Sequence, residues 1–234
     1  MPEQAPFVPG RNFYGRRHGK TLKQSHRAYL SEDLATLTPD GIGLAQNPAR
    51  VAIDPAAVFG DARPLWLEVG FGGGEHLVHM AALYPGVGII GCEPFVNGVA
   101  TLLGKIRKAG VDNLAIYPGD VRDVFDVLPA GSVAKAFLNY PDPWPKRRHF
   151  DRRFVNPVYL NALAQVMVPG GEFRVATDIA DYVRQTLIEV PRAGFIRADL
   201  PVDAPWADWI STRYEQKAIR AGRPPHYLTF HRAG

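Results

Sequence analysis

Residues 65–74 of this chain are Leu65-Trp66-Leu67-Glu68-Val69-Gly70-Phe71-Gly72-Gly73-Gly74, and this stretch decides the fold. Its first five residues form a short apolar run, which is typical of a buried strand. The glycines that follow indicate a tight turn, and residues 75–84 have helical character. The stretch therefore predicts a strand, a glycine turn and a helix in succession.

The same alternation continues toward the C-terminus. Asn156 is a predicted helix N-cap, because Pro157 follows it at the first helical position. We expect further helices at 95–108, 121–128 and 157–168, and further strands at 87–92, 114–117, 133–138, 172–176, 195–198 and 226–230. This pattern predicts an α/β fold, a doubly wound, seven-stranded, mostly parallel Rossmann-like sheet with helices on both faces. Ligands of such sheets bind outside the carboxyl ends of the strands.

Residues 1–55 differ from the rest of the 234-residue chain, because they are rich in glycine, proline and basic residues and lack sustained periodicity. They predict a basic, partly flexible N-terminal arm, followed by one domain over residues 56–234. No apolar segment suits export or a membrane span, so we expect a cytoplasmic protein without a membrane partner. The single cysteine, Cys92, excludes an internal disulfide, and the seven histidines lack metal-ligand spacing, so no metal is expected.

Charge is unevenly distributed along the chain. The segments 1–27, 146–153 and 213–234 together hold sixteen basic and three acidic residues, a net charge of +13. The remainder holds eleven basic and twenty acidic residues, a net charge of −9. Basic patches on an acidic body favour contact with a phosphate backbone. Each run taken alone is also compatible with an ordinary solvated face.

Acidic residues surround the predicted glycine turn. Gly70, Gly72 and Gly74 are followed by Glu75, where a dinucleotide fingerprint needs Gly or Ala. With Glu68 this makes a site that repels a pyrophosphate and favours an ammonium or sulfonium group. S-adenosylmethionine carries both of these cations and has no phosphate. The alternative is that the glycines only make a turn.

Two more acids follow the next two predicted strands. Glu93 is placed to accept hydrogen bonds from both ribose hydroxyls, and Asp120 to reach the adenine edge. The alternative is that these acids only cap helices.

The segment after the fourth predicted strand is Asn139-Tyr140-Pro141-Asp142-Pro143-Trp144-Pro145. Three prolines stiffen it, which favours a site that holds Asp142 and Trp144, although an ordinary proline-rich surface loop remains the alternative. Asp178 ends the fifth strand at the same edge, where it could equally be a helix N-cap.

These motifs resemble the bacterial tRNA (guanine-N7)-methyltransferases, which are class I methyltransferases dependent on S-adenosylmethionine. The resemblance covers about residues 65–230 and rests on the glycine turn, on Gly91-Cys92-Glu93-Pro94, on Gly119-Asp120, on Pro141-Asp142-Pro143-Trp144-Pro145-Lys146 and on Thr212-Arg213-Tyr214-Glu215. The chain departs from many members at Ile179, where they have Trp, and at residues 218–225, where they have a glycine-rich segment.

The resemblance implies roles for individual residues. Asp142 would be the catalytic residue and also a cofactor contact. The other cofactor contacts would be Glu68, Gly70, Gly72, Gly74, Glu93 and Asp120. The substrate would be bound by Lys146, Asp178, Thr212, Arg213, Tyr214 and Glu215, and the RNA by Arg148, His149, Phe150, Asp151, Arg152 and Arg153.

The expected activity is transfer of a methyl group from S-adenosylmethionine to N7 of the variable-loop guanosine 46 in tRNA. The expected partner is tRNA, without an obligate protein partner, for a monomer or a homodimer. Two other functions remain open: a nicotinamide-dependent oxidoreductase, which Glu68 and Glu75 disfavour, and an RNA-binding module with a relict cofactor pocket.

Overall fold

The structure is a computed structural model that describes residues 13–234. Its strands are β1 (Leu65–Val69), β2 (Gly88–Cys92), β3 (Leu114–Tyr117), β4 (Val133–Asn139), β5 (Met167–Thr177), β6 (Phe195–Arg197) and β7 (His226–Arg232). Its helices are α1 (Gln24–Glu32), α2 (Leu34–Leu37), α3 (Pro55–Phe59), α4 (Glu75–Leu83), α5 (Val96–Ala109), α6 (Val121–Phe125), α7 (Pro157–Val166), α8 (Ala180–Arg192) and α9 (Arg213–Arg220), with a 3₁₀ helix η1 (Arg147–Arg152).

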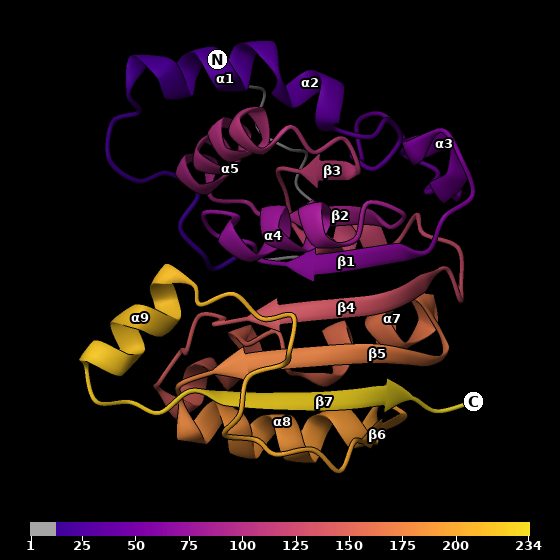
Figure 1. The fold of residues 1–234 in the computed structure, drawn as a ribbon. Helices are drawn as coiled ribbons and strands as arrows, with labels where there is room; N and C mark the ends of the chain where they lie inside the picture. The colour runs from indigo at the N-terminus through magenta and orange to yellow at the C-terminus, as the bar shows by residue number, and fades with distance from the viewer. Residues whose placement is uncertain (1–12) are drawn as a thin grey trace.

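The strands form one seven-stranded sheet in the order β3-β2-β1-β4-β5-β7-β6 (Figure 1). β1 to β5 are parallel, whereas β7 is antiparallel to both β5 and β6. The predicted doubly wound, mostly parallel, seven-stranded sheet is therefore confirmed. Strand order reverses between β1 and β4, so their carboxyl ends flank the switch point at which such sheets bind ligands.

Two apolar cores cover the two faces of the sheet. In β1, Leu65, Leu67 and Val69 belong to the core that includes α6, α7 and α8, while Trp66 belongs to the core that includes α4 and α5. The alternation follows from the pleat of a strand, which sends successive side chains to opposite faces. Because both faces are covered, β1 is apolar almost throughout, and its one charged residue, Glu68, stands out.

The helix predicted over residues 121–128 is shorter, because α6 ends at Phe125, and the predicted boundary between α7 and β5 is wrong. β5 begins at Met167 rather than at Glu172, and α7 ends at Val166 rather than near residue 168. Met167 pairs with Val133, and the pairing then shifts so that Glu172 lies opposite Lys135. The Pro169-Gly170-Gly171 segment, which predicts a break between helix and strand, instead lies inside an irregular part of the strand.

The N-terminal residues that the structure describes are largely docked on the domain. α1 packs on α5, where Arg107 makes 2.6 Å ion pairs with Glu32 and Asp33. Ile42 is fully buried in the core that faces α6 and α7. Residues 1–12 of the predicted arm lie outside the described residues. The boundary near residue 55 stays a prediction, and residues 24–59 add helices that the sequence did not predict.

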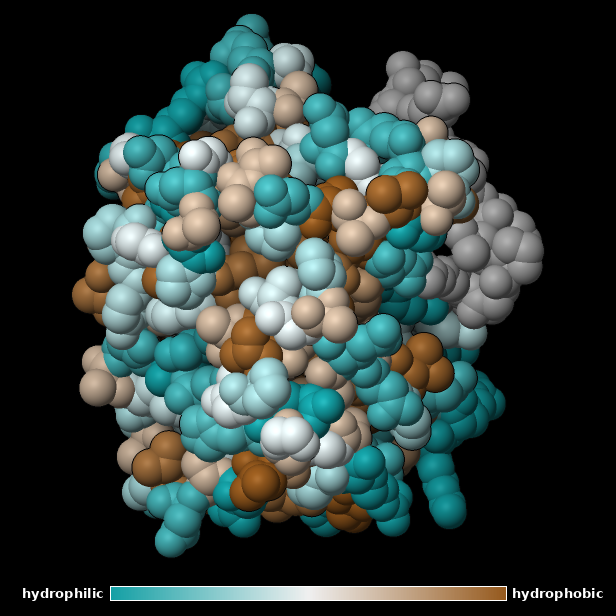
Figure 2. Space-filling model, turned by 90° about the vertical axis from the view of Figure 1, so that its right-hand side faces the viewer, coloured by the Kyte–Doolittle hydropathy of each residue, from teal (hydrophilic) through white to brown (hydrophobic). Residues whose placement is uncertain are grey.

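The two ends of the sheet differ. α9 lies beside the carboxyl ends of β4 and β5, at the left in Figure 1. Figure 2 views the opposite side, toward the amino ends of these strands, and shows apolar residues interspersed with hydrophilic ones. Within residues 13–234, no helix is long and apolar enough to cross a membrane.

Candidate active site

A cavity of about 840 Å³ opens at the carboxyl ends of β1 to β4. This volume lies within the usual range for small-molecule sites, about 300 to 1,000 Å³. Most of the predicted cofactor residues line it, namely Glu68, Gly70, Gly72, Glu93, Asp120 and Asp142. The topology therefore brings together residues that the sequence separates by up to 74 positions, because parallel strands end at one edge.

The glycine turn is shaped by backbone conformation and by close packing. Gly70 and Gly72 have φ angles of 69° and 56°, which side-chain-bearing residues rarely adopt. A Cβ on Gly98, in α5, would meet the carbonyl oxygen of Gly72 at 2.3 Å, so the helix and the turn touch through backbone. Gly74 does not line the cavity; it precedes α4 and packs on Leu102.

Glu93 is bound to this turn from the end of β2. Its Oε2 accepts a 2.7 Å hydrogen bond from the Gly72 N–H, and its Oε1 accepts one of 2.9 Å from the Phe95 N–H. Burial raises the pKa of Glu93, and these two N–H donors oppose that shift. Each carboxylate oxygen can accept a second hydrogen bond, so Glu93 retains acceptor capacity for a ligand hydroxyl.

Glu68 belongs to a buried polar cluster that forms part of the cavity wall. Glu68 is 2% exposed, and its Oε2 accepts a 2.8 Å hydrogen bond from Nδ1 of His76, in α4. Its Oε1 accepts a longer one, of 3.5 Å, from Nδ2 of Asn139. Asn139 Oδ1 is buried and has no hydrogen-bond partner among the described residues. This acceptor suits a ligand that brings an N–H donor.

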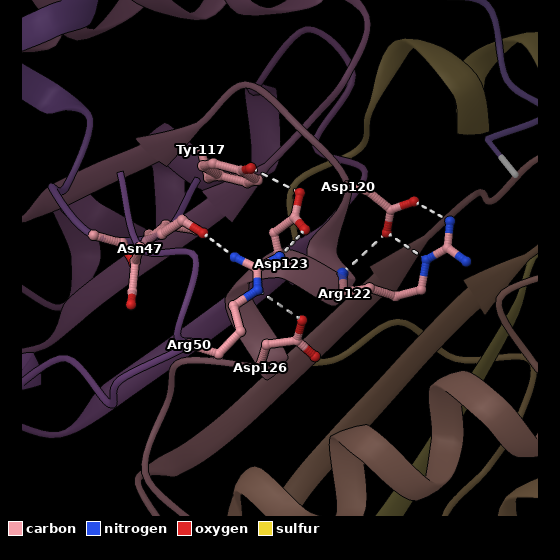
Figure 3. Close-up of polar contacts among 9 residues, drawn as sticks. Asn47, Arg50, Tyr117, Asp120, Arg122, Asp123 and Asp126 are labelled. Carbon is pink, nitrogen blue, oxygen red and sulfur yellow. Dashed lines mark hydrogen bonds and ion pairs between the residues drawn. The ribbon is translucent and has the colours of Figure 1, made fainter. Parts of the chain in front are cut away.

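Asp120 lies three residues after the end of β3 and is the N-cap of α6. Its carboxylate accepts from the Arg122 N–H at 2.9 Å and holds the Arg122 guanidinium at 2.6 Å and 3.0 Å (Figure 3). Part of its acceptor capacity is therefore used within the protein. Beside it, Arg50 pairs with Asp123 at 2.6 Å and with Asp126 at 3.2 Å. These pairs tie the N-terminal part of the described chain to α6, the helix that Asp120 caps.

Asp142 lies at the rim of the cavity in the loop that follows β4. The flanking Tyr140 and Trp144 have φ angles of 49° and 38°, in the left-handed region that costs free energy for such residues. Although the Asp142 residue is partly exposed to solvent, desolvation of its carboxylate by neighbouring atoms raises its pKa, and the positive charge of Arg16 opposes that shift. A strained, proline-fixed loop thus holds one carboxylate at the cavity rim.

Of the predicted substrate residues at the start of α9, some line the cavity and others do not. Thr212 caps the helix by accepting the Glu215 N–H at 3.3 Å, and it lines the cavity together with Tyr214, which lies against Gly72. The Arg213 guanidinium lies over the Tyr214 ring, 5.0 Å from its centre.

Glu215 does not line the cavity described above. It is 3% exposed, and its carboxylate accepts hydrogen bonds from Trp209 Nε1 at 3.0 Å, from Tyr140 Oη at 3.3 Å and from Tyr227 Oη. Burial and the nearby Glu215 carboxylate raise the pKa of both tyrosines, so they remain protonated donors. In this geometry Glu215 holds the aromatic wall behind Tyr140 rather than reaching into the cavity.

Two other predicted substrate residues lie outside the cavity lining. Asp178 forms a 2.5 Å ion pair with Arg223, which belongs to the segment where the chain departs from many family members. Lys146 is exposed and precedes η1. The structure therefore brings these two residues to the neighbourhood of the site without placing them on its wall.

The predicted RNA residues lie on and just after η1. Arg148 is exposed, and its Nε is 3.4 Å from Nε2 of His149, whose pKa is lowered by desolvation and by the neighbouring cations. The Arg152 guanidinium lies 4.4 Å from the Tyr14 ring centre and 5.2 Å from that of Trp144. Phe150 packs under a neighbouring guanidinium, and the Asp151 carbonyl accepts a hydrogen bond from Asn156.

Arg153 differs from the other predicted RNA residues, because it is 1% exposed and its guanidinium is hydrogen-bonded within the protein. The predicted contact between Arg153 and RNA does not fit this burial. Sequence reasoning also missed His76, Asn139 and Arg16 as cavity residues. His76 and Asn139 had a detectable signal, since each is a polar residue next to a strand or glycine turn of the site.

Comparison with known proteins identifies the family. Residues 62–228 match the family described as "Putative methyltransferase". A tRNA (guanine-N(7)-)-methyltransferase from Paracoccus denitrificans is 67% identical over 234 residues, which covers 99% of each chain. The chain belongs to the tRNA (guanine-N(7)-)-methyltransferase family. A more distant family member, from Rhodospirillum rubrum, is 46% identical over 99% of this chain and 91% of its own.

Solved structures share the fold of this family member. The 16S rRNA methyltransferase KamB superposes with a TM-score of 0.58 at 17% identity, over 79% of this chain and 99% of its own. A mutant of the 16S rRNA (adenine(1408)-N(1))-methyltransferase from Catenulisporales acidiphilia, solved with the cosubstrate SAM, gives a TM-score of 0.54 at 18% identity, over 79% and 93% of the two chains. At these identities the likeness concerns the fold.

Proposed function

We propose that this protein transfers a methyl group from S-adenosylmethionine to N7 of a guanosine in tRNA, at variable-loop position 46. The observation that carries the proposal is an acid-lined cavity at the switch point of the sheet, beside a basic surface on η1. A cationic cofactor suits the cavity, and a polyanionic substrate suits the surface. Membership of the family supports the same reaction. We further propose that the protein acts in the cytoplasm as a monomer or a homodimer.

The residues at the strand ends fit S-adenosylmethionine. Asn139 Oδ1, buried and without a partner among the described residues, would accept from the ammonium group, and Glu68 beside it adds negative charge. Glu93 would accept from the ribose hydroxyls, and Asp120 would lie at the adenine edge. The bound cofactor would supply an electrophilic methyl group. No residue of the cavity would then need to neutralise a phosphate.

Methylation of guanine N7 requires that the purine and the methyl group be held in line, and it requires no proton transfer. N7 carries a free lone pair and loses no proton on methylation, so no general base is required. Holding reactants in line contributes up to about 7 to 11 kcal/mol in well-oriented systems. Asp142 lies on a stiff loop at the cavity rim. There it would orient the purine and stabilise the positive charge that develops on it.

Methyl transfer tests this directly. Cofactor labelled in its methyl group, incubated with bulk tRNA lacking the modification, should label 7-methylguanosine after nuclease digestion. Replacing guanosine 46 of a transcript by adenosine should abolish labelling. Asp142→Asn should lower it strongly, whereas Asp199→Asn, which removes an exposed carboxylate beyond β6, should not. Labelling of another nucleotide, or none with wild-type protein, would overturn the proposal.

A further inference from the structure

The loop that carries Asp142 is held from inside the protein by one side chain. Arg153 Nε donates a 2.8 Å hydrogen bond to the carbonyl of Pro143, and its Nη2 donates one of 3.3 Å to the carbonyl of Trp144. These are the carbonyls of the next two residues after Asp142. The guanidinium therefore reaches the backbone directly beside the proposed catalytic carboxylate.

The guanidinium is itself fixed on the opposite side. Its Nη1 donates to Gln185 Oε1 at 2.7 Å, and its Nη2 forms a 2.9 Å ion pair with Asp181, both residues of α8. The Phe150 ring lies 3.8 Å from the guanidinium carbon. A buried arginine is stable when its charge is paired and its donors are used, and Arg153 meets both conditions.

The backbone of this loop has few hydrogen-bond donors of its own. Pro141, Pro143 and Pro145 have no N–H to donate, and Trp144 is kept at a φ of 38°. A strained backbone persists only where its surroundings determine it. Here the Arg153 guanidinium fixes the backbone, because its N–H groups form a rigid planar fork that binds two carbonyls of the loop.

We infer that Arg153 is a positioning residue, which locks the Pro143–Trp144 backbone onto α8 and so fixes the place of Asp142, and that it does not contact RNA. The inference rests on the proposed function for the role of Asp142. The inference assigns different roles to two adjacent arginines of the basic run, Arg152 and Arg153. Arg152 lies against Trp144 and Tyr14 near the cavity rim, whereas Arg153 lies beneath the loop.

The test compares Arg153→Lys with Arg184→Lys. Arg184 pairs with the same Asp181 at 2.7 Å, but it is exposed, and among the described residues no hydrogen bond or ion pair joins it to the loop. A lysine at 153 keeps the charge and loses the fork, so kcat with saturating tRNA should fall at least tenfold. The KM for tRNA should change less than threefold, and Arg184→Lys should behave as wild type. Gln185→Ala, which removes one partner of the guanidinium, should lower kcat by a smaller factor with the fold intact.

Salt dependence separates positioning from RNA contact. Each phosphate contact contributes about 0.7 to 0.9 to the slope of log K against log salt concentration. Arg148→Ala should reduce this slope, and Arg153→Lys and Gln185→Ala should leave it unchanged. A slope reduced by Gln185→Ala, or a raised KM with unchanged kcat in Arg153→Lys, would overturn the inference.

Hydrogen exchange makes the outcome independent of activity. Amides in a peptide covering residues 139–150 should exchange faster in Arg153→Lys and Gln185→Ala than in wild type or Arg184→Lys. If wild-type protein methylates no tRNA while these amides still exchange faster, the proposed function fails and the hold on the loop stands. Unchanged exchange, or unchanged kcat in an active enzyme, would refute the positioning role itself.

Discussion

Replacing Glu93 by Gln tests the cofactor site at the residue with the best-defined geometry. The two carboxylate oxygens accept from the Gly72 and Phe95 N–H groups at 2.7 Å and 2.9 Å. A glutamine has one carbonyl oxygen, so it can satisfy one of these donors and presents an NH₂ group to the other. Leaving one buried donor unsatisfied costs about 1 to 3 kcal/mol of unfolding free energy.

The expected loss of cofactor affinity follows from the same geometry. A charge-assisted hydrogen bond to a ribose hydroxyl contributes about 1.5 to 3 kcal/mol, so the dissociation constant for S-adenosylmethionine should rise about tenfold to a hundredfold. Calorimetric titration measures this, and a thermal melt of the same sample measures the fold. Glu93→Ala should weaken binding by a similar amount and free both N–H groups. Affinity within threefold of wild type in a folded variant would refute the ribose assignment.

The pH dependence of cofactor affinity and of stability provides a second test of the role of Glu93. Burial raises its pKa above the ordinary 4.5, and the accepting form is the anion. Cofactor affinity in wild type should therefore fall as pH decreases, starting above the ordinary pKa of a glutamate. For stability the sign is opposite: the native state holds the proton more tightly, so this group favours folding more at low pH than at high pH. Glu93→Gln should remove its share of both dependences.

Three other predictions concern the loop, the basic surface and the N-terminal segment. Asp142→Asn should lower the rate of single-turnover methylation on the order of a hundredfold, while tRNA affinity, measured by filter binding, changes little. Because the pKa of Asp142 is raised, the wild-type rate should fall as the pH decreases through that pKa. Arg148→Ala combined with Arg152→Ala should weaken tRNA binding and flatten its salt dependence, and an unchanged salt slope would contradict the phosphate contact. The Asn97 side chain accepts a 2.7 Å hydrogen bond from the Gly19 N–H and donates one of 2.7 Å to the Lys20 carbonyl, so it anchors the N-terminal segment. Asn97→Ala removes both bonds, so trypsin should cleave the segment from residue 16 to residue 20 faster than in wild type. Cleavage at the wild-type rate would contradict this anchoring role.

The core of the fold could be predicted because its signals are local. The apolar run of β1, the glycines after it and the helix that follows are contiguous, and strand-end acids lie beside them in the sequence. The place of β7 between β5 and β6 has no such signal, because it depends on pairing between distant segments. α1 lacks a strong apolar stripe, and it is stabilised by α5 through Arg107, 74 residues from its partner Asp33.

The candidate site was predictable in position and less so in the direction of its side chains. Strand topology brings Glu68, Glu93, Asp120 and Asp142 to one cavity without any knowledge of rotamers. Topology does not show which of the acidic side chains remain free of protein partners and so available to a ligand. Asp120 is engaged by Arg122 and Asp178 by Arg223, and neither pair follows from a motif. Partners of this kind are chosen by packing, which a pattern of residue types does not contain.

The basic run shows why charge in a sequence does not by itself identify an interface. Residues 146–153 supply five cations next to a site, and a count treats them as equivalent. Their environments separate them, since Arg148 faces solvent and Arg153 is bound on both sides by the protein. An arginine whose donors are already used has little left for a phosphate, whatever its neighbours bind. We therefore expect one eight-residue segment to serve both tRNA binding and the positioning of the Asp142 loop, and each arginine must be tested separately.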